Sequence, residues 1–111
     1  MDFKIEEIEI ESNVYSIYIG RNAKGNEQII KMSHPESIWF HFDNISSAHI
    51  ILESKGDTIP KRYLNQIASK LFEYKTNAPK NLNVIYTNVK NVKLTNTLGT
   101  VIPSKTKMIK F

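Results

Sequence analysis

Cysteine is absent from this chain of 111 residues. Its absence excludes a disulfide scaffold, a thiol nucleophile, a zinc–cysteine site and an iron–sulfur cluster. Apolar runs all fall short of the roughly 18 residues that a membrane-spanning helix requires. The N-terminus, residues 1–7, is acidic and lacks the basic start and the apolar core of a signal peptide. We therefore expect a soluble, cytoplasmic protein.

A strong compositional bias is also lacking. Hydrophobic residues make up 41% of the chain and charged residues 23%, and both values lie close to globular averages. These values exclude a disordered, collagenous or coiled-coil chain. The length suits one hydrophobic core, so residues 1–111 are expected to form a single domain.

Charge, by contrast, is unevenly distributed along the chain. Residues 1–54 carry four basic and nine acidic side chains, a net charge of −5, whereas residues 55–111 carry eleven basic and two acidic ones, a net charge of +9. Unpaired lysine is too costly to bury, so the second half is expected to expose a basic surface that attracts polyanions, nucleic acid above all. The alternative is that acidic residues 6, 7, 9 and 11 neutralise part of this surface.

One clear helix is predicted in the second half of the chain. Five apolar residues recur at three- and four-residue spacing and would share one helical face: Leu64, Ile67, Ala68, Leu71 and Phe72. This stripe predicts a helix over about residues 59–76, with Thr58 as its N-cap and Pro60 just inside it.

The remaining pattern favours strands. β-Prone segments predict strands over residues 4–11, 14–19, 38–42, 47–52, 82–87, 99–102 and 106–110. Residues 20–27 are predicted to form a polar loop, residues 28–32 a short strand or helical turn, and residues 33–37 a capped turn with Pro35 at the first position of a helix. The expected fold is therefore α+β, a mostly antiparallel sheet with one main helix packed on it.

Four motifs, taken in order, resemble those of the NFACT-R domain family. They are Gly20-Arg21-Asn22 with Asn26-Glu27 downstream, Ile38-Trp39-Phe40-His41, Ser46-Ser47-Ala48-His49, and Val84-Ile85-Tyr86-Thr87 running into basic residues 90–93. Residues 99–101 and the terminal strand also fit, so the resemblance spans about residues 14–111. No single motif is decisive, but their order and spacing together form a strong signal.

This resemblance implies an RNA-binding module. Large members of the family act in ribosome-associated quality control, where they recruit tRNA to the large ribosomal subunit, and their R domain is viewed as an RNA-binding unit. Ser46 and Ser47 stand where those large proteins typically have proline and glycine. The serine pair is similar to the small, stand-alone eukaryotic coiled-coil-domain-containing branch.

A polar loop after the predicted strand at residues 14–19 holds Arg21, Asn22 and Lys24. Arginine can bind phosphate through a bidentate fork, asparagine offers its amide edge, and glycine leaves backbone N–H groups open. We predict that these residues contact nucleic acid, and the alternative is an ordinary solvated loop. The loop lacks the Gly-Lys-Ser/Thr ending of a phosphate-binding P-loop.

His41 and His49 lie on neighbouring predicted strands that a short connection joins. If those strands pair, both imidazoles share one face and can stack on bases or donate to phosphate. The alternatives are two structural histidines or a metal site, and we predict no metal because Asp43 is the only close acid. Ser47, His49 and Asp43 make a weak triad, so no catalysis is expected.

Aromatic and basic residues complete the predicted binding set. Trp39 and Phe40 alternate on one predicted strand, so one faces the core and the other the opposite face. Trp39 is a candidate stacking platform, with a core position as the alternative. Five lysines are candidate phosphate contacts that act weakly and jointly: Lys90, Lys93, Lys105, Lys107 and Lys110.

Together these residues predict a non-catalytic nucleic-acid-binding module that needs no cofactor. RNA, tRNA-like or ribosomal, is favoured over DNA, and sequence specificity should be modest because lysine acts as a point charge. Two other hypotheses stay open: a protein-interaction adaptor whose basic surface docks an acidic partner, and a hydrolase that uses His41 or His49.

Overall fold

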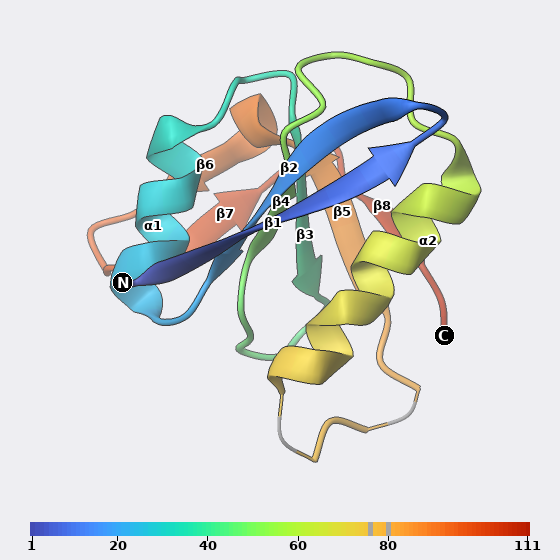
Figure 1. Cartoon of the computed structure of the whole chain (residues 1–111). Coiled ribbons are helices and arrows are strands. Elements are labelled where there is room, and N and C mark those ends of the chain that lie inside the picture. Colours follow the sequence, from blue (N-terminus) through green and yellow to red (C-terminus); the bar gives the residue numbers. More distant parts are fainter. Residues whose placement is uncertain (76, 80) are drawn as a thin grey trace.

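A computed structural model describes residues 1–75, 77–79 and 81–111 (Figure 1). The elements run in the order β1 (Phe3–Ile10), β2 (Asn13–Gly20), α1 (Ala23–Met32), β3 (Ile38–Phe42), β4 (Ile50–Leu52), α2 (Lys61–Ser69), the 3-10 helix η1 (Lys70–Tyr74), β5 (Val84–Asn88), the 3-10 helix η2 (Val89–Asn91), β6 (Val92–Leu94), β7 (Val101–Pro103) and β8 (Lys107–Ile109). These helices and antiparallel strands confirm the predicted α+β fold.

Six strands form the main sheet, in the order β1-β2-β4-β3-β5-β8, and β6 and β7 form a small second sheet. All the pairings are antiparallel. In the centre of the main sheet Ile50 pairs with both Ile19 and Phe40. This register places Gly20, at the end of β2, beside His49, which directly precedes β4.

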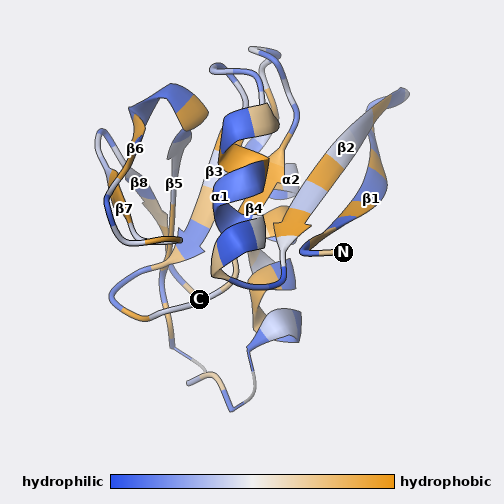
Figure 2. Ribbon diagram, turned by 90° about the vertical axis from the view of Figure 1, so that its left-hand side faces the viewer, coloured by the Kyte–Doolittle hydropathy of each residue, from blue (hydrophilic) through white to orange (hydrophobic). Residues whose placement is uncertain are grey.

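The main sheet has a hydrophobic core on each face because successive strand residues point to opposite sides. On one face Phe40 and Phe42 of β3 pack in a cluster with Ile67 and Leu71 from α2 and η1. The opposite face carries a cluster that contains Trp39 of β3 and Ile29 of α1. Figure 2 shows the two helices on opposite sides of β3 and β4. The expectation of one main helix is therefore incomplete.

Helix α1 is the main element that the sequence pattern did not predict. It occupies most of the predicted loop at residues 20–27 and the apolar run at residues 28–32. Its buried positions are Gly25, Asn26, Ile29 and Ile30, so two of the four lack an apolar side chain and the helical stripe is hidden. The cap signal is present, since the Asn22 side chain accepts a hydrogen bond from the Gly25 N–H at 2.8 Å.

The predicted helix at residues 59–76 is shorter and irregular. Pro60, not Thr58, is the N-cap, and after Ser69 the chain tightens into η1, which ends at Tyr74. The predicted helical residue Thr76 lies outside the described residues. Pro35, which was expected to begin a helix, lies instead in a turn closed by the Ser37 N–H and the His34 carbonyl.

The strand predictions differ from the structure mainly at their ends. The N-terminal hairpin is confirmed, with Glu11 and Ser12 at positive φ in its turn. β4 begins at Ile50 instead of residue 47, and β6 forms within a stretch for which no strand was predicted. Within the described part of the chain, no helix is long and apolar enough to cross a bilayer.

The α2 face of the core gives a direct test of this packing. Ile67 is fully buried, whereas its neighbour Gln66 is exposed. We expect Ile67→Ala to lower the free energy of unfolding by about 2–4 kcal/mol, because a cavity replaces the lost side chain. Gln66→Ala should change it by less than about 0.5 kcal/mol. Urea unfolding followed by the fluorescence of Trp39, the only tryptophan, measures both, and equal losses would contradict this packing.

Candidate functional site

A cavity of about 430 Å³ opens where four chain segments converge. The end of β2 and the start of α1 contribute residues 20–23 and 26, and the end of β3 with the connection to β4 contributes residues 41 and 46–49. Tyr74 of η1 and residues 98–100, between β6 and β7, complete the lining. Arg21, Asn22, His41 and His49, all predicted from sequence, are thus brought together.

Arg21 and Asn22 are held at the mouth of this cavity by the N-terminus of the chain. The Arg21 N–H donates to the Asp2 carbonyl at 2.9 Å, and Asn22 Nδ2 donates to Asp2 Oδ1 at 3.1 Å. The Arg21 side chain is exposed, and within the described residues it forms no ion pair. A guanidinium at the start of α1 is therefore available to an anion in solution.

Asn26 is a buried residue that locks three elements together behind the cavity. Its Oδ1 accepts the His49 N–H at 3.0 Å, and the Gly20 N–H donates to the His49 carbonyl at 2.9 Å. A Cβ atom at Gly20 would lie 1.9 Å from Asn26 Oδ1, so the close approach of β2 to α1 requires glycine. Asn26 was noted only within a motif, and an isolated polar residue gives no signal of this buried role.

His41, His49 and Trp39 form a compact cluster on one face of the sheet. The two imidazole centroids lie 4.9 Å apart at 88°, and the Trp39 and His41 rings stack at 5.5 Å and 7°. Trp39 Nε1 donates to His49 Nδ1 at 3.1 Å. The two histidines therefore share a face, as the predicted strand pairing required.

The hydrogen bonds of this cluster define the tautomer of each histidine. The indole N–H can only donate, so His49 Nδ1 is unprotonated and a neutral ring carries its proton on Nε2. The Phe42 carbonyl can only accept, so His41 Nδ1 carries the proton and its Nε2 is an acceptor while the ring is neutral.

Burial keeps both rings neutral near pH 7. Together with the smaller effect of the charge that His41 would carry, burial lowers the pKa of His49 to about 3. Burial also lowers the pKa of His41, against a smaller raising effect of the hydrogen bond to the Phe42 carbonyl. The cavity thus presents neutral imidazoles to a ligand instead of imidazolium cations.

Trp39 is 1% exposed and belongs to the hydrophobic core. Its ring is covered by the surrounding side chains in this conformation, so it offers no open surface for a base. Trp39 supports the site indirectly, because its indole orients His49 and stacks on His41. Its predicted contact with nucleic acid stays a prediction, and the structure gives it a positioning role.

The predicted lysines lie apart from the cavity. Within the described residues no lysine lines it. Lys24 on α1 pairs with Asp2 at 3.8 Å, Lys90 pairs with Glu36, and Lys93 is exposed on β6. Lys105 and Lys107 line a different depression. Their contact with nucleic acid stays a prediction. Their distance from the cavity lining gives it no direct support.

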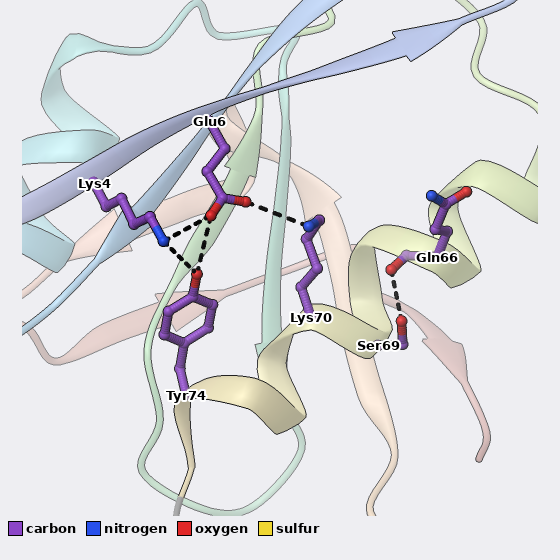
Figure 3. A network of polar contacts seen from close by, with 6 residues as sticks. All are labelled: Lys4, Glu6, Gln66, Ser69, Lys70 and Tyr74. Atoms are coloured by element: carbon purple, nitrogen blue, oxygen red, sulfur yellow. Dashed lines mark hydrogen bonds and ion pairs between the residues drawn. The ribbon is translucent and has the colours of Figure 1, made fainter.

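Tyr74 at the cavity rim was not predicted from sequence. Its hydroxyl lies 3.4 Å from Glu6 Oε2 and 3.5 Å from Lys4 Nζ, and Glu6 also pairs with Lys70 at 3.3 Å (Figure 3). These contacts join η1 to β1, elements about 70 residues apart in sequence. Local pattern carries no signal for such a long-range tether.

In the described portion of the chain, no three His, Cys, Asp or Glu side chains are grouped so that they could hold a metal ion.

Comparison with known proteins finds one matching family profile and several similar curated proteins. A family profile described as "NFACT protein RNA binding domain" matches residues 3–110. Coiled-coil domain-containing protein 25 from Bos taurus and from Mus musculus is 38% identical over 101 residues, which cover 86% of this chain and 49% of each relative. The chain therefore spans about half the length of these curated relatives.

Two bacterial proteins show more distant similarity. The Rqc2 homolog RqcH of Streptococcus pneumoniae is 34% identical over 59 residues, 52% of this chain and 10% of that protein. The solved structure of the C-terminal part of the fibronectin/fibrinogen-binding protein from Streptococcus suis superposes with a TM-score of 0.80 at 19% identity, covering 96% of this chain and 44% of that one. This structural likeness establishes the shared fold.

The buried, neutral state of His49 predicts how stability depends on pH. The pKa of His49 is about 3 in the folded chain and near 6.5 when unfolded, so the unfolded state binds more protons between these values. The free energy of unfolding should therefore fall as pH drops from 6.5 toward 3, by about 1 kcal/mol per pH unit from this group.

His49→Asn removes this titration and leaves a side-chain oxygen that can accept the Trp39 N–H. Urea unfolding at several pH values within the window measures both proteins. The variant should lose stability less steeply than the wild type on acidification, whatever its stability at pH 7. Parallel curves would show that His49 is not buried in the neutral form.

Proposed function

The chain belongs to the NFACT protein RNA-binding domain family, and we propose that it is a non-catalytic module that binds structured RNA, tRNA-like or ribosomal, chiefly through phosphates. The family match over residues 3–110 supports nucleic-acid binding in general. The resemblance to small coiled-coil-domain-containing proteins, predicted from the serine pair at residues 46 and 47, is confirmed by the relatives at 38% identity.

The exposed side chain of Arg21 is the main reason for locating the proposed binding surface at the cavity. The Arg21 guanidinium is exposed at the mouth of the cavity and forms no ion pair with the described residues. It stands one residue before the N-cap of α1, where backbone N–H groups and the helix dipole also favour an anion. A phosphate held there would place the adjoining nucleotide over the cavity.

Ion pairs within the fold neutralise part of the basic charge, which favours a localised contact with nucleic acid instead of a uniformly basic binding face. Acidic residues of the β1–β2 hairpin pair with basic residues of the second half, since Glu6 contacts Lys70 at 3.3 Å and Glu11 contacts Arg62 at 3.5 Å. Part of the positive charge counted in the sequence is thus neutralised locally. The exposed lysines 93, 105, 107 and 110 are left to add a weak, salt-sensitive attraction.

A ribosome-associated setting is the finer part of the proposal. The name of the relative RqcH refers to Rqc2, and the match to it covers about half of this chain. In this setting the module would contact tRNA or ribosomal RNA, and its sequence specificity would be modest because phosphate contacts position a protein without reading bases.

The two arginines of the chain provide a matched test. Arg21→Ala and Arg62→Ala each remove one exposed positive charge, but only Arg21 lines the cavity. We expect Arg21→Ala to weaken binding to labelled tRNA on the order of tenfold, because a charge-assisted contact is lost, and Arg62→Ala by less than about twofold. Fluorescence anisotropy at about 50 and 200 mM salt measures the affinities and the salt slope.

Three outcomes of this titration contradict the proposal in different ways. Equal weakening by both variants would indicate general attraction between charges and not a site at the cavity. Tighter binding to duplex DNA than to tRNA would make DNA the ligand. An absence of nucleic-acid binding, with a nuclease-resistant protein partner recovered at 1:1 stoichiometry, would favour the adaptor hypothesis.

A further inference from the structure

Resting on the proposed RNA binding, we infer that the cavity receives one unpaired nucleobase, with His41 and His49 at its hydrogen-bonding edge and Tyr74 beside its face. The phosphate contact of Arg21 lies outside, at the rim. The inference goes beyond phosphate binding because it gives the module a means of preferring bulged or looped RNA over regular duplex.

The hydrogen-bonding groups of the cavity suit a base and not a phosphate. The Nδ1 atoms of both histidines are engaged, one by the Phe42 carbonyl and the other by the Trp39 indole, so the two Nε2 atoms remain for a ligand. One is a donor and the other an acceptor. Base edges carry both kinds of group, whereas phosphate oxygens only accept and would meet the lone pair of His41 Nε2 unfavourably.

The charge of the lining leads to the same conclusion. Among the described residues that line the cavity, Arg21 is the only one with a formally charged side chain, and it is exposed. His49 at the inner end is 2% exposed and neutral. A phosphate drawn inside would lose its water without gaining a cation, which is costly, whereas a neutral base loses less.

The rim supplies surfaces for the flat faces of a base. Tyr74 is 36% exposed, and its hydroxyl is held by the contacts to Glu6 and Lys4 shown in Figure 3. Leu98, 54% exposed, belongs to the loop that closes another side of the cavity. A ring that is already ordered loses little entropy when a base stacks on it.

The close approach of the residue 98–100 loop to α1 gives the cavity a defined shape. Gly99 has φ +77°, and a Cβ atom there would lie 2.7 Å from Cβ of Ala23. Only glycine allows this approach without strain.

A second depression of about 430 Å³ adjoins the first, and the two share His41, Ser46, His49, Gly99 and Thr100. His41 and His49 therefore line both depressions, and the second one leaves room for the backbone of an extruded nucleotide.

The inference is tested with two kinds of RNA hairpin that differ only in the presence of one base. One carries a single bulged nucleotide in its stem, and the other has an abasic site at the bulge, so the phosphate charges of the two RNAs are identical. The bulged nucleotide is made in all four base identities. We expect the abasic RNA to bind the wild-type protein about tenfold or more weakly than the best base, since one stacked base is lost.

Two variants locate the base in the cavity. Tyr74→Leu removes the aromatic face, and His41→Phe keeps a ring beside Trp39 but removes the acceptor. Each should reduce the ratio of abasic to base-containing dissociation constants toward one, while the salt slope stays at the wild-type value. Tyr74→Phe, which retains the ring, is the matched control and should retain most of the ratio. Trp39 fluorescence verifies that each variant is folded.

The outcomes separate this inference from the proposed function. Equal binding of base-containing and abasic RNA by the wild type would overturn the inference and leave phosphate-mediated RNA binding standing. A base preference that survives in both Tyr74→Leu and His41→Phe would place the base elsewhere and would also overturn it. Failure of every RNA to bind would overturn the proposed function and the inference together.

Discussion

The position of His49 is the constraint on which the site depends. Its backbone is held by Asn26 Oδ1 and by the Gly20 N–H, and its ring is held by the Trp39 indole. These contacts join β2, α1 and β3 to the residue that directly precedes β4. Each of them is buried, so the loss of one partner would leave an unsatisfied polar group in the core. The same contacts that close the core therefore orient the ring that lines the cavity.

The cavity divides its chemistry between a charged rim and a neutral interior. Arg21 stands outside, where water screens its charge and a phosphate can approach without being buried. His41 and His49 lie inside, where burial lowers the pKa of both rings and their tautomers follow from their partners. Under the proposed function, this separation places affinity at the rim and discrimination in the interior. It also explains why the lysines of the second half can lie elsewhere, since general attraction does not require them at the cavity.

Sequence pattern could predict the elements whose signal is local. The β1–β2 hairpin is rich in β-prone residues that alternate with one slip, and the apolar stripe of α2 recurs at helical spacing, so both were found. Helix α1 was missed because its buried face begins with Gly25 and Asn26, neither of which has an apolar side chain. Gly25 allows a close approach to the backbone of Asp2, and Asn26 makes a buried hydrogen bond. The shared face of His41 and His49 followed from alternation once their strands were paired. The roles of Tyr74 and Asn26 depend on contacts made far along the chain, which no local pattern records.

The most direct measurement is that of the tautomer and protonation state of the His49 ring with and without RNA. Nitrogen-15 spectra of the imidazoles, recorded over about pH 5 to 8, report both tautomer and protonation. We predict a neutral His49 with its proton on Nε2 throughout this range, and a shift of that Nε2 signal when the RNA hairpin with a bulged nucleotide is added. A His49 ring that titrates near its ordinary value of 6.5, or one that stays unchanged in saturated complex, would contradict it.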